Sequence, residues 1–127
     1  MITKEERNAN ILAHILRYCQ RIGEYLSRFD GDAARFMSDA MYCDAVAMCE
    51  FQIGELTGRL SDEFKERHSS EIPWKAIRGM RNLFAHDYLN MDKERIWNSA
   101  TVDVPALKKF CEEQIKLSET DKNIRDE

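Results

Sequence analysis

The chain has 127 residues, of which 43% are hydrophobic and 33% charged, and it contains only 5 glycines and 2 prolines. This length predicts a single domain over residues 1–127, and the scarcity of glycine and proline argues against a many-turned β-sandwich and favours long helices. The formal net charge of −4 excludes a general coat for nucleic acid, so any such contact has to use a local basic face.

The first helix is predicted over residues 4–28, where apolar residues recur at steps of three and four. Asp32 can cap a short helical turn that reaches Met37, and Ser38 can cap a second long helix that extends to Leu60. Residues 61–67 are expected to form a short polar extension of that helix.

Pro73 fits the first turn of a third helix, which is expected to end between Asp87 and Asn90. Asp92 can cap a short helix through Ser99, residues 101–103 are expected to form a link, and Pro105 is expected to open the last helix. Residues 118–127 form a charged tail that is expected to be flexible. The predicted fold is therefore an all-α bundle of four to five main helices plus short ones.

No apolar run is long enough to span a membrane, and the charged first residues do not resemble a signal peptide, so a cytoplasmic protein is expected. The four cysteines form no C-x-x-C pair, and the chain has only three histidines. No metal site and no cofactor are therefore predicted. The cysteines are expected to be reduced and packed in the core; they are Cys19, Cys43, Cys49 and Cys111.

Residues 78–88 carry the most informative pattern in the chain. On an α-helical wheel, Arg78, Asn82 and His86 lie on one side, opposite the apolar stripe, because they are four residues apart. Arg81 and Tyr88, seven residues apart, lie nearly in line at the border of the two faces. The same part of the chain is locally basic, since residues 65–86 hold five Lys or Arg against two Glu. Taken alone, such a helix pattern is more often a solvated polar face with a stray histidine, and the basic excess can be ordinary scatter of surface charge.

Such a set of side chains suits cleavage of a phosphodiester without a metal. An imidazole such as that of His86 can take a proton from a ribose 2′-hydroxyl near neutral pH. A guanidinium such as that of Arg81 can bind phosphate oxygens while negative charge develops on them, and the amide of Asn82 can orient the phosphate.

The stretch from Arg81 to His86 matches the R-x4-6-H signature of HEPN domains, and with Tyr88 it resembles the R-x4-H-x-Y motif of HepT-like ribonuclease toxins. Other blocks of the chain resemble that family in the same order, namely residues 53–55, 60–64, 71–74, 78–82 and 85–88. The resemblance spans residues 11–110, and it departs from the family pattern at Asp87 and Asn90, where the family often has glycine.

The resemblance implies an up-and-down HEPN helical bundle that acts as a homodimer, with the two R-x4-H segments facing each other. It implies a metal-independent endoribonuclease toxin of a type VII-like toxin–antitoxin system, with RNA as substrate. Arg81 and His86 would be catalytic, and Asn82 and Arg78 would support them. Tyr88 would be the site where a minimal nucleotidyltransferase antitoxin attaches AMP, and the phosphate of that AMP could pair with Arg81 or Arg78 and block RNA.

Two questions stay open at the level of sequence. Glu55 can be an ordinary exposed carboxylate, or it can lie near the site and hold Arg81 or His86. The whole chain can instead be a non-catalytic module that binds a nucleotidyltransferase or a nucleotide, or a helical scaffold whose polar helix end has no function.

Overall fold

The computed structural model describes residues 1–84 and 92–126. Helix α1 (Lys4–Arg28) has the predicted bounds. It begins with a capping box, in which the Thr3 hydroxyl accepts a hydrogen bond from the Glu6 backbone N–H and the Glu6 carboxylate accepts one from the Thr3 N–H. One face of α1 is buried along most of its length; it consists of Asn8, Ile11, Leu12, Ile15, Cys19 and Ile22.

Helices α2 (Ala33–Ser38) and α3 (Ala40–Thr57) follow with almost no linker between them. Asp32 caps α2 as predicted, but the predicted Ser38 cap of α3 is wrong. The Asp39 carboxylate caps α3 by accepting from the Tyr42 N–H at 3.1 Å, while the Ser38 hydroxyl donates back to carbonyls of α2. Ser38 and Asp39 are adjacent in sequence and both can cap a helix, but the Ser38 hydroxyl is already hydrogen-bonded to the last turn of α2.

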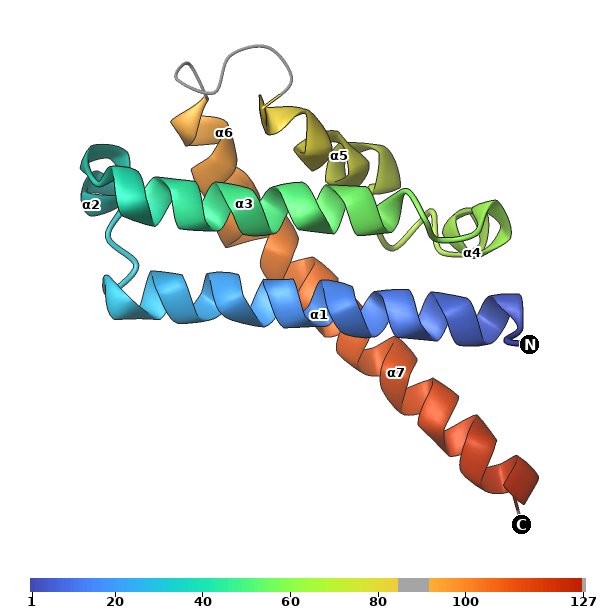
Figure 1. Cartoon of the computed structure of the whole chain (residues 1–127). Helices are drawn as coiled ribbons and strands as arrows, with labels where there is room; N and C mark the ends of the chain where they lie inside the picture. Colours follow the sequence, from blue (N-terminus) through green and yellow to red (C-terminus); the bar gives the residue numbers. More distant parts are fainter. Residues whose placement is uncertain (85–91, 127) are drawn as a thin grey trace.

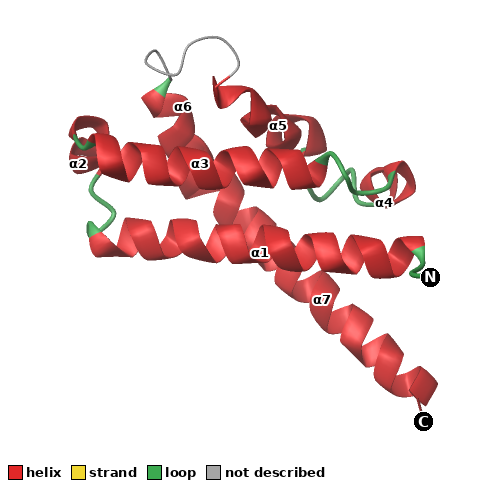
Figure 2. Ribbon diagram, viewed as in Figure 1, coloured by secondary structure: helices red, strands yellow, loops and turns green. Residues whose placement is uncertain are grey.

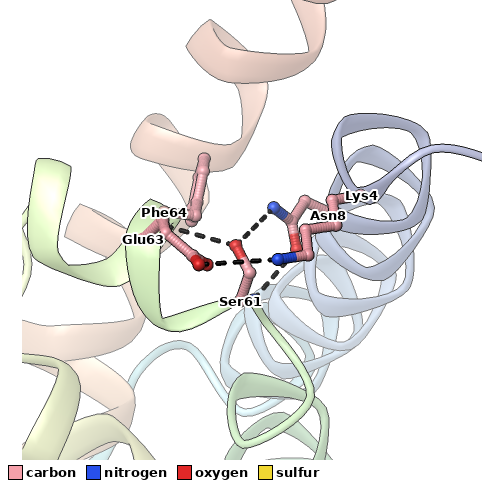
Figure 3. A network of polar contacts seen from close by, with 5 residues as sticks. All are labelled: Lys4, Asn8, Ser61, Glu63 and Phe64. Carbon is pink, nitrogen blue, oxygen red and sulfur yellow. Dashed lines mark hydrogen bonds and ion pairs between the residues drawn. The ribbon is translucent and has the colours of Figure 1, made fainter.

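Helix α4 (Asp62–Arg67) is a separate helix and not an extension of α3. Ser61 caps it and connects it to α1 (Figure 3), because the Asn8 amide donates to the Ser61 hydroxyl at 3.0 Å and accepts from the Ser61 N–H at 3.1 Å. Lys4 adds an ion pair to Glu63 at 3.5 Å. Asn8 is buried, so this polar contact fixes the start of α4 against the start of α1.

Helix α5 (Trp74–Arg78) is short and passes into the 3₁₀ helix η1 (Gly79–Phe84). One continuous α-helix was predicted here, so the prediction is wrong over Gly79–Phe84, and its predicted end lies outside the described residues. A 3₁₀ helix has three residues per turn, so side chains three apart share a face. Ile77, Met80 and Leu83 follow this spacing; the first two are buried and Leu83 is half-buried.

Helix α6 (Lys93–Asn98) is capped by Asp92 as predicted. The link predicted at residues 101–103 is wrong, because the π-helical turn η3 (Ser99–Asp103) connects α6 directly to α7 (Val104–Asp126). Residues 118–124 of the predicted tail are an exposed part of α7; the flexibility of the tail stays a prediction.

Helix α1 packs on one side against α3 and on another against α7, while α5, η1 and α6 pack on α3 (Figure 1). The described part of the chain contains helices and loops but no strand (Figure 2), which confirms the predicted all-α bundle. No helix within that part is long and apolar enough to cross a membrane. Helix α3 therefore lies between α1 and the segment that carries Arg81.

Candidate functional site

Two glycines, Gly54 on α3 and Gly58 directly after its last residue, let the segment from Arg78 to Arg81 approach closely. A Cβ atom on Gly54 would lie 2.5 Å from the backbone nitrogen of Arg81 and 3.0 Å from the carbonyl oxygen of Arg78. A Cβ atom on Gly58, one turn later, would lie 3.4 Å from Nε of Arg78. Only glycine allows backbones to approach this closely, so Gly54 sets the position of η1 on α3.

Arg81 forms an ion pair with Glu55 across this contact. Its Nε lies 3.1 Å from Oε1 of Glu55, and the two side chains are 46% and 34% exposed. A guanidinium has five N–H donors in a planar fork, so one contact through Nε leaves donors for an anion while it fixes the plane of the group. Of the two possibilities left open for Glu55, the structure therefore supports the one near Arg81.

The 3₁₀ geometry changes which predicted residues share a face. On the α-helical wheel, Arg78 and Asn82 lay together and Arg81 lay at the border. In the structure Arg78 and Arg81 are three residues apart at a 3₁₀ turn, and so point the same way. Arg78, Arg81 and Asn82 are all exposed, and all three line the same pocket.

This basic pocket has a volume of about 640 Å³ and is open to solvent. It is lined by Lys65, Trp74, Lys75, Arg78, Gly79, Arg81 and Asn82. Four of these residues are cationic and none is acidic, although the chain as a whole has a net charge of −4. The pocket is therefore a local basic face of the kind that an acidic protein needs to bind a polyanion.

Lys65, Lys75 and Trp74 were not predicted as site residues. The excess of basic residues over 65–86 was the available signal, but the sequence does not show that α4 brings Lys65 to the same hollow as α5. Trp74 is also part of the core, because it is 8% exposed and contacts Phe110, with ring centroids 5.6 Å apart.

The predicted His86 and Tyr88 lie outside the described residues, as do Asp87 and Asn90. The structure thus brings together Arg81, Glu55, Arg78 and Asn82 but gives no geometry for the histidine or the tyrosine. Within residues 1–84 and 92–126, no three His, Cys, Asp or Glu side chains form a group that could hold a metal ion.

The most strongly shifted carboxyl group lies in the core, not in the basic pocket. Glu50 on α3 is completely buried, and neither carboxylate oxygen has a hydrogen-bond partner in the structure described. Burial raises its pKa to about 9, the nearby Asp103 adds to that shift, and Arg95 opposes it. Glu50 is therefore uncharged near neutral pH.

All four cysteines are free and buried, as predicted. Burial raises the pKa of the Cys19 thiol to about 12 and that of Cys49 to about 11. Thiols with such pKa values are not nucleophiles near neutral pH, so the cysteines belong to the core and not to the site.

Comparison with known proteins gives a consistent result. The family described as "Ribonuclease HepT-like" matches residues 15–114 of the chain. A protein of Caldanaerobacter subterraneus subsp. tengcongensis is 32% identical over 102 residues, covering 80% of this chain and 88% of that protein. A protein of Methanocaldococcus jannaschii is 30% identical over 105 residues, covering 83% and 88%. Both are named "Putative RNase".

A protein of Thermococcus cleftensis named "Probable ribonuclease HepT" is 28% identical over 96 residues, which cover 72% of this chain and 86% of that protein. No solved structure gives a significant match.

Proposed function

This chain belongs to the HepT-like ribonuclease family, and from that membership we propose that it is a metal-independent endoribonuclease that acts as the toxin of a toxin–antitoxin pair. The observation that carries the proposal is the Arg81 guanidinium, which lines the basic pocket and is held by Glu55. A half-exposed, oriented guanidinium beside other cations is suited to bind a phosphodiester.

In the proposed reaction, the imidazole of His86 takes the proton of a ribose 2′-hydroxyl. The 2′-oxygen attacks the adjacent phosphorus, the bond from phosphorus to the 5′-oxygen breaks, and a 2′,3′-cyclic phosphate remains. A protonated imidazole supplies the proton that the leaving 5′-oxygen needs. Arg81 binds the phosphate oxygens as charge develops on them, and the amide of Asn82 helps to orient them.

We further propose that two copies of the chain form this site together. The exposed face of α3 carries Met41 and Met48, which are 84% and 51% exposed. Glu55 follows after another seven residues and so lies on the same face. A second copy that covers this face would bury the methionines and bring the two Arg81 side chains toward each other. Replacement of Met48 by Lys should then shift the protein from dimer to monomer in sedimentation.

Tyr88 is proposed as the site at which a nucleotidyltransferase antitoxin attaches AMP. The phosphodiester of that AMP is an anion close in sequence to Arg81 and could occupy the place of an RNA phosphate. Mass spectrometry after incubation with the antitoxin and ATP should show the added mass on the wild type and not on Tyr88→Phe.

The central experiment is cleavage of labelled RNA by the purified protein in the presence of a chelator. Cleavage is expected with the wild type and with Arg17→Ala, a matched control on the exposed face of α1, and DNA should stay intact because it lacks the 2′-hydroxyl. Loss of cleavage is expected with Arg81→Ala and with His86→Ala. A need for added divalent metal, or full activity without His86, would contradict the mechanism.

A second candidate function is a non-catalytic module that binds a nucleotidyltransferase or a nucleotide. The net charge of −4 favours it, because a nuclease that grips long RNA is usually more basic. Expression of the chain alone in cells separates the two: growth arrest that Arg81→Ala relieves supports the toxin, whereas no effect on growth at any expression level supports the binding module.

A further inference from the structure

The basic pocket extends beyond the residues to which the proposed reaction assigns a role. Arg81 and Asn82 line it, and so do Lys65 on α4 and Lys75 on α5. We propose that Lys65, Lys75 and Arg78 bind the backbone phosphate of an RNA nucleotide that flanks the bond to be cut. This inference rests on the proposed function for the identity of the ligand, but it concerns binding and not the chemical step.

Lys65 is held in place more firmly than an ordinary surface lysine. Its side chain is only 17% exposed, and its one ion-pair contact in the structure described is a long one, 3.9 Å, to the almost fully exposed carboxylate of Asp62. A side chain that is mostly covered has less rotamer freedom to lose when an anion binds. The Asn8–Ser61 hydrogen bonds fix the start of α4 on α1 (Figure 3), so the position of Lys65 is set before any ligand binds.

Arg78 lines the same pocket as Lys65. Its Nε lies against Gly58 at the end of α3, and Lys75 precedes it by three residues on the same short helix α5. Neither Lys75 nor Arg78 has an ion-pair partner within the described residues, where four ion pairs were found. Their charges are therefore available to an anion in the pocket.

The size of the pocket fits one nucleotide. Its volume of about 640 Å³ falls within the range of roughly 300–1,000 Å³ that is typical of small-molecule sites. A second hollow of about 560 Å³ shares Trp74 and Lys75 with it and continues toward Ser69 and Pro73. Trp74 and Lys75 thus lie between two hollows on the surface of α5, and the cationic side chains line the first of them.

The test is the binding of a short fluorescent single-stranded RNA, followed by anisotropy over a range of salt concentrations. All proteins carry His86→Ala, which prevents cleavage if the proposed function is right. The double variant Lys65→Gln/Lys75→Gln should bind about tenfold more weakly, and the slope of log Kd against log salt should fall by about 0.7, the value expected for the loss of one contact to a single-stranded phosphate.

The matched control is Lys109→Gln/Lys116→Gln, which removes the same charge from exposed positions on α7 and should leave both affinity and slope unchanged. Lys65→Arg should keep the affinity, and thermal melting of each variant shows that it is folded. Unchanged binding by the folded Lys65/Lys75 variant overturns the inference. Free AMP serves as a competitor of the labelled RNA. If AMP displaces that RNA as well as unlabelled RNA does, and if the Lys65/Lys75 variant loses this competition, the pocket binds free nucleotides and the inference is overturned.

The two proposals fail in different ways. If the wild type binds RNA through these lysines but never cuts it, the nuclease proposal fails and the pocket assignment stands. If the wild type cuts RNA through Arg81 while the lysine variant binds and cuts like the wild type, the pocket assignment fails and the nuclease proposal stands.

Discussion

The buried carboxyl group of Glu50 makes the stability of this protein depend on pH in a way that one substitution should abolish. The side chain is 0% exposed and has no hydrogen-bond partner in the structure described, and burial raises its pKa from 4.5 to about 9. Glu50→Gln keeps the shape of the side chain and removes its ability to ionise, so the variant isolates the free energy of that ionisation.

The direction of this pH dependence follows from the pH at which Glu50 loses its proton in the folded and in the unfolded state. In the unfolded chain Glu50 releases its proton above a pH of about 4.5, whereas in the folded protein it keeps the proton until about 9. Raising the pH between these values therefore favours the unfolded chain, by about 1.4 kcal/mol for each pH unit. The resulting loss of stability is about 3 kcal/mol at pH 7 and is absent below the unfolded-state pKa.

Urea unfolding of the wild type and of Glu50→Gln measures this effect. The free energy of unfolding of the variant should exceed that of the wild type by a margin that grows from about 1 kcal/mol at about pH 5 to about 5 kcal/mol at about pH 8. Glu24→Gln, an exposed carboxyl on α1, is the control and should show no such growth. A margin for Glu50→Gln that does not change with pH would refute the reasoning.

Three further predictions test the architecture of the site. Gly54→Ala should lower the free energy of unfolding by more than about 2 kcal/mol and reduce RNA cleavage, because its Cβ would collide with the backbone of η1. The control Gly23→Ala has open space around it on α1, and thermal melting should show that it stabilises the protein by about 0.5–1 kcal/mol. Asn8→Ala should cost about 1–3 kcal/mol in chemical unfolding, since it leaves the Ser61 N–H without its partner; an unchanged midpoint would mean that the contact is dispensable. Glu55→Gln should reduce kcat about tenfold while the melting temperature moves by only a few degrees, because a half-exposed ion pair contributes about 1 kcal/mol or less; equal losses of activity and stability would indicate a merely structural carboxylate.

Much of the helical framework could be predicted from the sequence. The bounds of α1 and the caps at Asp32 and Asp92 were correct because helix formation and capping involve residues three or four apart, and those neighbours are visible in the sequence. The absence of strands among the described residues follows from the same local periodicity. The free, buried cysteines were also predicted, from their spacing alone.

The tertiary structure decided how these helices make a site. The choice of a 3₁₀ helix at Gly79 depends on contacts with α3, 25 residues away in sequence at Gly54, and no local signal specifies it. The close approach of η1 to Gly54 also places Arg81 beside Glu55, which decided between the two interpretations of Glu55. The packing of α4 on α1 brought Lys65 to the pocket. Sequence periodicity reports which face of a helix is buried, but the partner of that face is set by shape and close approach between segments distant in the chain.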